Sequence, residues 1–266
     1  MRKEIKGKEI KNTILAILVE FAEYCEKHGL RYYLCYGTLL GAIRHKGFIP
    51  WDDDIDVSMP RPDYLKLHEL VKAEPISEKY KLVSSLTGES IYPFAKIIDL
   101  STEVVSLDNT EETNLWIDIF PLDGVPDGDE GAKHLELAYN LRYHLMLSIQ
   151  KLGTGKTRTK AFLKLPLVIG AKIIGKNRWL ERIETNSLKY GFDECDLIAA
   201  VSFSLGKREI NIKSEYIQPE KVEFEGYEFN APSCWKKYLS QMYGDYMQLP
   251  PENKRYTHKI KAYICE

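Results

Sequence analysis

The residues from 33 to 64 constrain the fold of this chain more than any other stretch, because they combine a strand-like apolar run, a glycine turn and a dense acidic segment. The acidic segment contains the pattern Asp-Ile-Asp-Val. Residues two apart on a β-strand point to the same face, so the pattern predicts that Asp54 and Asp56 lie side by side while Ile55 and Val57 enter a core. Two adjacent carboxylates repel each other unless a cation lies between them. Oxygen ligands on a strand, with room for phosphate and water, suit Mg²⁺.

A third carboxylate completes the predicted metal site. Asp118 stands alone in the middle of the apolar run 115–120, and an unpaired buried aspartate is costly. A metal ion shared with Asp54 and Asp56 would remove that cost. Pro121 leaves a second interpretation open, in which Asp118 is a turn residue at the end of a strand. The neighbouring acids at 52 and 53 are equally compatible with a solvated acidic turn.

Three segments carry a specific family resemblance. They read Tyr-Gly-Thr-Leu-Leu-Gly at 36–41, Arg-His-Lys-Gly-Phe-Ile-Pro-Trp-Asp-Asp-Asp-Ile-Asp at 44–56 and Ile-Asp-Ile-Phe-Pro-Leu-Asp-Gly at 117–124. Together they closely resemble the LicD family, bacterial phosphocholine transferases related to fukutin and fukutin-related protein, and the resemblance continues into the C-terminal tail. It implies a nucleotidyltransferase-like fold and transfer of phosphocholine from CDP-choline to a sugar of a cell-surface glycan.

Residues between the first strand and the acids are candidates for phosphate binding. In the nucleotidyltransferase fold that the resemblance implies, a turn such as Gly37-Thr38 lets backbone N–H groups approach nucleotide phosphates. Arg44 offers bidentate phosphate contacts and Lys46 a point charge, with His45 between them. The alternative is a solvated basic loop, and for His45 it remains open.

Four further residues are candidates for substrate contacts. Lys96, inside a strand-like run, lies either at a sheet edge or opposite an anion, and we favour a phosphate contact. Trp51 is either a core residue or a platform for a base or a cationic head group. Asp53 is a candidate substrate ligand and, with Asp118, a candidate general base. His258, in a tail that resembles the family, is expected near the site, with a surface histidine as the alternative.

The spacing of apolar residues along the rest of the chain predicts both helices and strands. Apolar residues at helical spacing predict a helix that starts near residue 10 and ends near Gly29, where glycine can adopt a left-handed conformation. A helix is expected from Pro62 or Asp63. Strands are expected at 33–36, 81–85, 92–98, 103–107 and 115–120, and a long helix at 132–151. The predicted class is α/β (α+β): a nucleotidyltransferase-like mixed β-sheet core flanked by helices, with a helical C-terminal part.

Length and composition limit the number of domains, the possible binding partners and the cellular compartment. At 266 residues we expect a catalytic core at 1–128 and a part at 129–266 that packs on it, forming one continuous domain. A net charge of −2 argues against a general nucleic-acid binder. The five cysteines are odd in number and form no Cys-x-x-Cys pair, which argues against a disulfide framework and a zinc ribbon. A cytoplasmic location is the simplest expectation, and it suits a nucleotide-activated donor.

The segment 151–189 is basic and interspersed with apolar and aromatic residues. Its acids are only Glu181 and Glu184, whereas lysines and arginines recur throughout. A basic amphipathic segment of this kind can lie on an anionic membrane surface. Contact with the inner face of the membrane would bring the enzyme to a lipid-linked acceptor. The alternative is a helical lid over the sheet.

The functional prediction is a metal-dependent group transfer. Asp54, Asp56 and Asp118 would hold Mg²⁺, with Mn²⁺ as the alternative, while Arg44 and Lys96 stabilise charge on the phosphates. Choline cannot donate hydrogen bonds, so aromatic faces must hold it. The candidate aromatics are Tyr36, Trp51, Tyr92, Trp116, Trp235, Tyr243 and Tyr246.

Two rival functions stay open at this point. The same residues could transfer a nucleotidyl group from a triphosphate to a small molecule or RNA, or the chain could be a non-enzymatic binding module. The sequence also leaves the acceptor open among lipopolysaccharide, teichoic acid and capsule, and the donor head group among choline, ethanolamine and an alditol.

Overall fold

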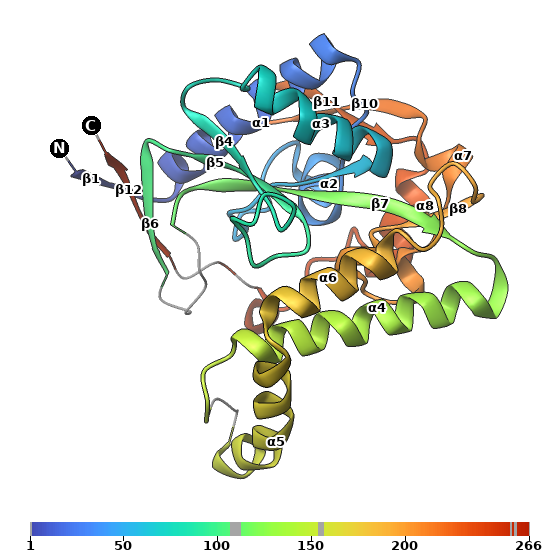
Figure 1. Cartoon of the computed structure of the whole chain (residues 1–266). Coiled ribbons are helices and arrows are strands. Elements are labelled where there is room, and N and C mark those ends of the chain that lie inside the picture. The colour runs from blue at the N-terminus through green and yellow to red at the C-terminus, as the bar shows by residue number, and fades with distance from the viewer. Residues whose placement is uncertain (1, 107–112, 154–156, 256, 258–259, 266) are drawn as a thin grey trace.

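The centre of the molecule is a mixed β-sheet with helices on both of its faces (Figure 1). The computed structural model describes residues 2–106, 113–153, 157–255, 257 and 260–265. The helices are α1 (Lys8–His28), α2 (Tyr36–His45), α3 (Arg61–Ala73), α4 (Gly128–Ile149), α5 (Arg158–Ile174), α6 (Lys176–Ser187), α7 (Lys213–Tyr216) and α8 (Trp235–Tyr243). In Figure 1, α1 and α3 lie above the sheet, and α4 and α6 lie below it.

The strands form a central sheet and two smaller ones. They are β1 (Arg2–Ile5), β2 (Tyr33–Leu34), β3 (Asp56–Pro60), β4 (Tyr80–Val83), β5 (Ala95–Asp99), β6 (Thr102–Ser106), β7 (Trp116–Val125), β8 (Leu197–Ala199), β9 (Asn211–Ile212), β10 (Pro219–Phe224), β11 (Tyr227–Pro232) and β12 (Ile260–Cys265). The central order is β2-β3-β7-β5-β4, and β8 and β9 extend it from the end of β7. Strands β3 and β7 run parallel, whereas the neighbouring pairs are antiparallel.

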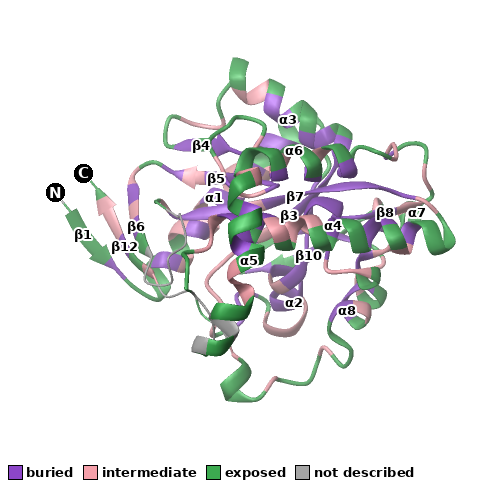
Figure 2. Ribbon diagram, turned by 60° about the horizontal axis from the view of Figure 1, so that its bottom comes forward, coloured by how far each residue is buried: buried purple, intermediate pink, exposed green. Residues whose placement is uncertain are grey.

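The predicted mixed class is confirmed, and so are the main helices. Helix α1 buries the apolar residues of its predicted face and ends at Gly29, whose φ of 62° is left-handed. Helix α3 begins at Arg61 with Pro62 in its first turn, where the missing N–H costs nothing. Figure 2 shows that the central strands are almost entirely buried, as expected for a sheet covered on both faces.

Several predicted boundaries were wrong. Strand β2 ends at Leu34, and Tyr36 already belongs to α2, so the Gly-Thr pair opens a helix and not a turn. Strand β3 begins at Asp56, so Asp54 precedes the strand. The segment 151–189, for which no element boundaries were predicted, contains two helices, α5 and α6. The C-terminal half contributes strands as well as helices, and β12 pairs with both β1 and β6.

A buried ion pair fixes α6 against the sheet. Arg61, 5% exposed at the start of α3, donates two hydrogen bonds to Asp123 on β7, at 2.5 and 3.0 Å, and a third to Glu184 on α6, at 3.0 Å. Gly124 follows Asp123, and a Cβ there would lie 2.4 Å from the carbonyl oxygen of Gly191. The chain after α6 therefore packs closely against β7.

Candidate active site

Three polar side chains lie in one row across the centre of the sheet. Asp56 on β3 is the register partner of Asp118 on β7, which in turn is the partner of Lys96 on β5. Side chains at paired positions of neighbouring strands point to the same face. The ammonium group of Lys96 donates to the Asp118 carboxylate at 2.6 Å. The predicted acids at 56 and 118 are therefore neighbours, and the predicted lysine joins them.

Strand alternation explains why this row is accessible although the strands are buried. On β7, Ile117 and Ile119 are fully buried, whereas Asp118 keeps 13% of its side chain exposed. The residues on either side of Asp118 on its own face are the aromatic Trp116 and Phe120. Asp118 is therefore a polar side chain between two aromatic ones, which form part of an aromatic wall of the site.

A pocket of about 450 Å³ contains this row. Of the described residues, it is lined by Tyr36, Gly37, Asp52, Asp54, Asp56, Tyr92, Phe94, Lys96, Trp116, Asp118, Phe120, Phe203, Leu205 and Tyr243. All three acids predicted as metal ligands are among them. Of the predicted aromatics, Tyr36, Tyr92, Trp116 and Tyr243 reach the pocket.

Aromatic side chains of this wall also surround Lys96. The Lys96 ammonium lies 4.5 Å from the ring centroid of Tyr92 and 4.6 Å from that of Trp116, which are cation–π distances. Lys96 is 4% exposed, so its charge is held by the Asp118 carboxylate and by aromatic faces rather than by water. Lys96 thus lies opposite an anion, the Asp118 carboxylate, and the phosphate contact favoured from the sequence stays a prediction.

The pocket carries an excess of negative charge. Four of the described lining residues are carboxylates, and one is a lysine. Burial raises the pKa of Asp56 well above its usual value, and the charges of Asp54, Asp118 and Asp52 raise it further, while Lys96 opposes them. An acid in this position favours either a proton or a nearby cation.

The carboxylates of the pocket suit a divalent metal ion, although they do not form a complete set of metal ligands. Carboxylate oxygens are the ligands that Mg²⁺ prefers. Among the described residues, however, no three acidic, histidine or cysteine side chains are close enough to one another to form a ready-made metal site. Asp56 and Asp118 form the paired part, and Asp54 lies in the loop that leads into β3. The metal set stays a prediction.

The predicted phosphate turn is the first turn of α2. Gly37 lines the pocket, and a Cβ at this position would lie 2.7 Å from a carboxylate oxygen of Asp52. Thr38 is buried, and its hydroxyl accepts the backbone N–H of Asp56 at 2.8 Å. Thr38 therefore positions the start of β3 and does not face the pocket. The amino end of α2 points partial positive charge toward the acids.

The basic cluster lies at the other end of α2. Arg44 donates to the ring of His45 at 2.9 Å and to the carbonyl oxygen of Tyr246 at 2.9 Å. Burial lowers the pKa of His45, and the charge of Arg44 lowers it further. Lys46 is exposed at the left-handed end of the helix, with a φ of 60°. None of the three is among the described residues that line the pocket.

The remaining predicted residues lie apart from the pocket or outside the description. Trp51 packs under the guanidinium of Arg255, 4.4 Å from the ring centroid. Trp51 and Asp53 line a separate hollow beside β1 and β12. His258 lies outside the described residues. Their predicted roles stay predictions.

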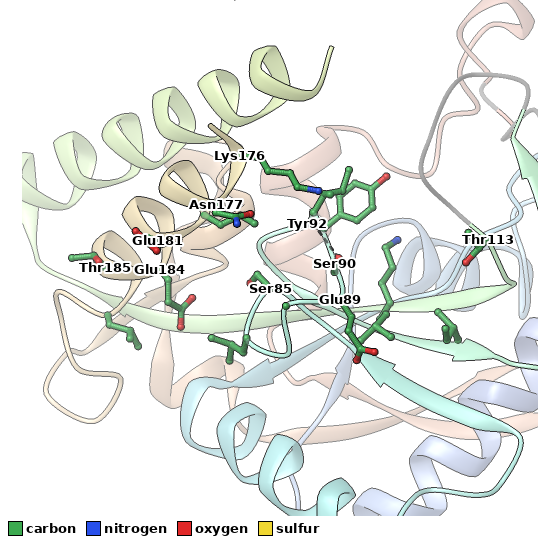
Figure 3. Close-up of a pocket in the computed structure, with 18 residues that line it drawn as sticks. Ser85, Glu89, Ser90, Tyr92, Thr113, Lys176, Asn177, Glu181, Glu184 and Thr185 are labelled. Atoms are coloured by element: carbon green, nitrogen blue, oxygen red, sulfur yellow. Dashed lines mark hydrogen bonds between the residues drawn. The ribbon is translucent and has the colours of Figure 1, made fainter. Parts of the chain in front are cut away.

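A second hollow, of about 680 Å³, adjoins the pocket (Figure 3). The two share Tyr92 and Lys96. It lies between α6 and the loop from β4 to β5. Its labelled side chains are mostly hydroxyl, amide and carboxylate groups: Ser85, Glu89, Ser90, Tyr92, Thr113, Lys176, Asn177, Glu181, Glu184 and Thr185. The sequence analysis did not identify this hollow.

Sequence reasoning also missed a buried acid behind the pocket. Glu209 is 2% exposed and accepts the Tyr36 hydroxyl with both carboxylate oxygens, at 3.1 and 3.3 Å. Tyr36 has a left-handed φ of 44°, a strained conformation for a tyrosine. Phe94 and Phe120 were also missed, although the alternation around Lys96 and Asp118 could have indicated them. No local pattern points to Glu209 or Phe203.

Comparison with known proteins identifies the family of this chain. Residues 29–143 match the family described as LicD/FKTN/FKRP, nucleotidyltransferase domain. The chain is 33% identical to the lipopolysaccharide cholinephosphotransferase LicD of Haemophilus influenzae, over 98% of this chain and 99% of that protein. It is 30% identical to the human ribitol 5-phosphate transferase FKRP, over 45% of this chain and 24% of that protein.

The full-length similarity to a cholinephosphotransferase confirms the prediction of an enzyme that transfers a group. The matched region 29–143 contains all three predicted metal acids and Lys96, and of the described residues that line the pocket only Phe203, Leu205 and Tyr243 lie outside it. The chain belongs to the LicD/FKTN/FKRP family, as its motifs around Gly37, Asp54 and Asp118 predicted.

Proposed function

We propose that this enzyme transfers phosphocholine from CDP-choline to a sugar hydroxyl of a cell-surface glycan of the lipopolysaccharide type. The observation that carries the proposal is the composition of one pocket, in which carboxylates stand beside an aromatic wall. The seven aromatic lining residues are Tyr36, Tyr92, Phe94, Trp116, Phe120, Phe203 and Tyr243. A quaternary ammonium group binds aromatic faces, and a pyrophosphate needs cations.

The aromatic residues would bind the choline part of the donor, and other residues of the pocket would bind its pyrophosphate. Asp54, Asp56 and Asp118 would hold Mg²⁺ or Mn²⁺, which supplies charge neutralisation to the pyrophosphate. Lys96 adds a fixed positive charge beside them. The first turn of α2 lines the same pocket with Tyr36 and Gly37, so the positive end of the helix dipole would favour a phosphate there.

The proposed reaction is an in-line displacement at the β-phosphorus of CDP-choline. The acceptor hydroxyl oxygen forms a bond to this phosphorus, the bond to the bridging oxygen breaks, and CMP leaves with that oxygen. The hydroxyl proton passes to a base. Positioning and charge neutralisation account for most of the catalysis in reactions of this class.

The hollow beside the pocket suits the acceptor. It shares Tyr92 and Lys96 with the pocket, so a sugar held there would reach the donor phosphate. Hydroxyl, amide and carboxylate side chains, such as those of Ser90, Asn177 and Glu181, can exchange hydrogen bonds with sugar hydroxyls. In parallel assays with lipopolysaccharide, teichoic acid and capsule, we expect transfer to lipopolysaccharide.

We also propose a cytoplasmic location, which the proposed donor and the cysteines support. The five cysteines are all free, and Cys25 and Cys35 are buried in the core. Burial raises the pKa of both thiols, so they act as apolar packing residues. Free thiols are typical of a reducing compartment.

Thermal denaturation with different donors tests the proposal. A ligand that binds only the folded state, at about a hundred times its Kd, stabilises that state by about 2.7 kcal/mol. For a chain of this size this raises Tm by roughly 5–10 °C. We expect this increase with CDP-choline plus Mg²⁺, and a smaller one with CDP-ethanolamine or a CDP-alditol.

Two variants of equal charge change serve as test and control. D118N should abolish the increase that CDP-choline and Mg²⁺ give together. D129N changes an exposed acid on α4 and should leave the increase intact. An increase with CTP or ATP and none with CDP-choline would favour nucleotidyl transfer instead. Donor binding with no turnover on any glycan would favour a binding module.

A further inference from the structure

Helix α5 presents an unusually apolar surface to its surroundings. Its large exposed side chains are Phe162, Leu163, Leu167, Ile169 and Ile173, with exposed fractions of 74%, 69%, 51%, 43% and 80%. At 100° per residue these five positions lie within about half of the helix circumference. We call these five side chains the α5 face. Clustered apolar exposure of this kind marks a binding surface.

The helix projects from the body of the protein. In Figure 1 it extends below α4 and α6, away from the central sheet. Among its described residues, Val168 and Ala171 are buried and pack on Leu147 of α4 in a small cluster separate from the main core. At its end, Ile174 packs against Trp179 of α6 and Leu145 of α4. Lys172 donates to the carbonyl oxygen of Ser148 at 3.1 Å, which ties the helix to the end of α4. The α5 face is therefore free to meet a large flat partner.

The charge around the α5 face indicates what that partner is. Residues 151–180 contain eight lysines and arginines and no aspartate or glutamate. Lys176 and Arg178, which begin the next helix, are exposed. A second copy of the same face would bring like charges together. An anionic lipid surface satisfies both the apolar side chains and the cations.

We propose that α5 lies flat on an anionic phospholipid bilayer, with the α5 face in the interfacial region. A helix of 17 residues is about 25 Å long at 1.5 Å per residue. Among the described residues, no helix combines the length and the hydrophobicity needed to cross a bilayer. The contact is therefore peripheral. Since α6 follows α5 after Gly175 and lines the hollow beside the pocket, docking brings that hollow close to the lipid surface.

The proposal is tested by co-sedimentation with lipid vesicles, without donor or acceptor, so the result does not depend on the transfer reaction. Wild-type protein should sediment with phosphatidylcholine vesicles that contain phosphatidylglycerol, and less so as salt is raised. It should bind vesicles of phosphatidylcholine alone more weakly. The double variant F162S/I173S should bind the anionic vesicles at least about tenfold more weakly, because two side chains no longer enter the interface.

A matched control removes exposed apolar side chains elsewhere. L100S/Y227S changes two residues that are each 49% exposed, and it should bind like the wild type. Both double variants should stay folded with a Tm close to that of the wild type, since the four side chains are each about half exposed or more. Failure of the wild type to bind anionic vesicles would overturn the proposal. Equal binding by F162S/I173S would do the same, and so would a wild-type dimer in solution that F162S/I173S dissociates, because a second copy would then cover the face.

Discussion

Replacing Glu209 by glutamine should change how the stability of this protein depends on pH. Burial raises the pKa of Glu209 from 4.5 to about 7, and the Tyr36 hydroxyl, Arg208 and Arg142 only partly oppose this effect. The folded protein therefore holds a proton on Glu209 that the unfolded chain releases at lower pH. Folding stability falls with rising pH wherever the folded state binds more protons.

The size of the effect follows from the two pKa values. Below about pH 4.5 Glu209 is protonated in both states and costs nothing. Between 4.5 and about 7 the wild type loses stability, and above 7 the loss stays constant. A difference of about 2.5 pKa units corresponds to about 3 kcal/mol. Glu209 is 2% exposed, so solvent screening reduces this figure little.

Urea denaturation across this pH range measures the difference directly. We expect the free energy of unfolding of E209Q to exceed that of the wild type by an amount that grows from near zero at about pH 4.5 to about 3 kcal/mol above about pH 7. The glutamine oxygen can still accept the Tyr36 hydroxyl. E220Q, at an exposed site, should show no such trend. A difference that is independent of pH, or that favours the wild type at high pH, would refute the reasoning.

Three further substitutions test the pocket and the packing behind it. G37A places a Cβ 2.7 Å from a carboxylate oxygen in the pocket, and it should raise the KM for CDP-choline severalfold in steady-state kinetics while Tm changes little. K96M removes the cation beside Asp118, and it should lower kcat by about 10²–10³ in initial-rate assays at saturating donor. R61M leaves the carboxylate of Asp123 buried without its partner, and it should lower the free energy of unfolding by about 3–5 kcal/mol in urea. Adding D123L to R61M should restore much of that stability.

Much of the site could be predicted from the sequence because its charged residues stand in apolar segments, where such residues are unusual. Asp118 in an apolar run and Lys96 between apolar neighbours are costly unless something compensates them, and the structure places both in one row with Asp56. Period-2 alternation predicts which face of a strand a residue occupies. It could also have placed Phe94 and Phe120 in the wall.

The parts that sequence reasoning missed depend on contacts between distant segments. Glu209 meets Tyr36 across 173 positions of the chain, and no local pattern connects them. Strand β1 pairs with β12 at the other end of the chain. Thr38 was expected to offer its backbone N–H to phosphate, but the role of its hydroxyl, which accepts the backbone N–H of Asp56, was not foreseen. The spacing of residues in the sequence predicts which face of a helix or strand a side chain occupies. The segment that packs against that face depends on the tertiary fold.

The most direct test of the central claim is product analysis of the transfer reaction by ³¹P NMR. With CDP-choline, Mg²⁺ and lipopolysaccharide, we predict equal amounts of CMP and glycan-linked phosphocholine. D56N and D118N should each lower the rate by at least about 10². Removal of the metal with EDTA should stop the reaction. Transfer of a nucleotidyl group from a triphosphate with release of pyrophosphate, or full activity in D118N, would contradict the account.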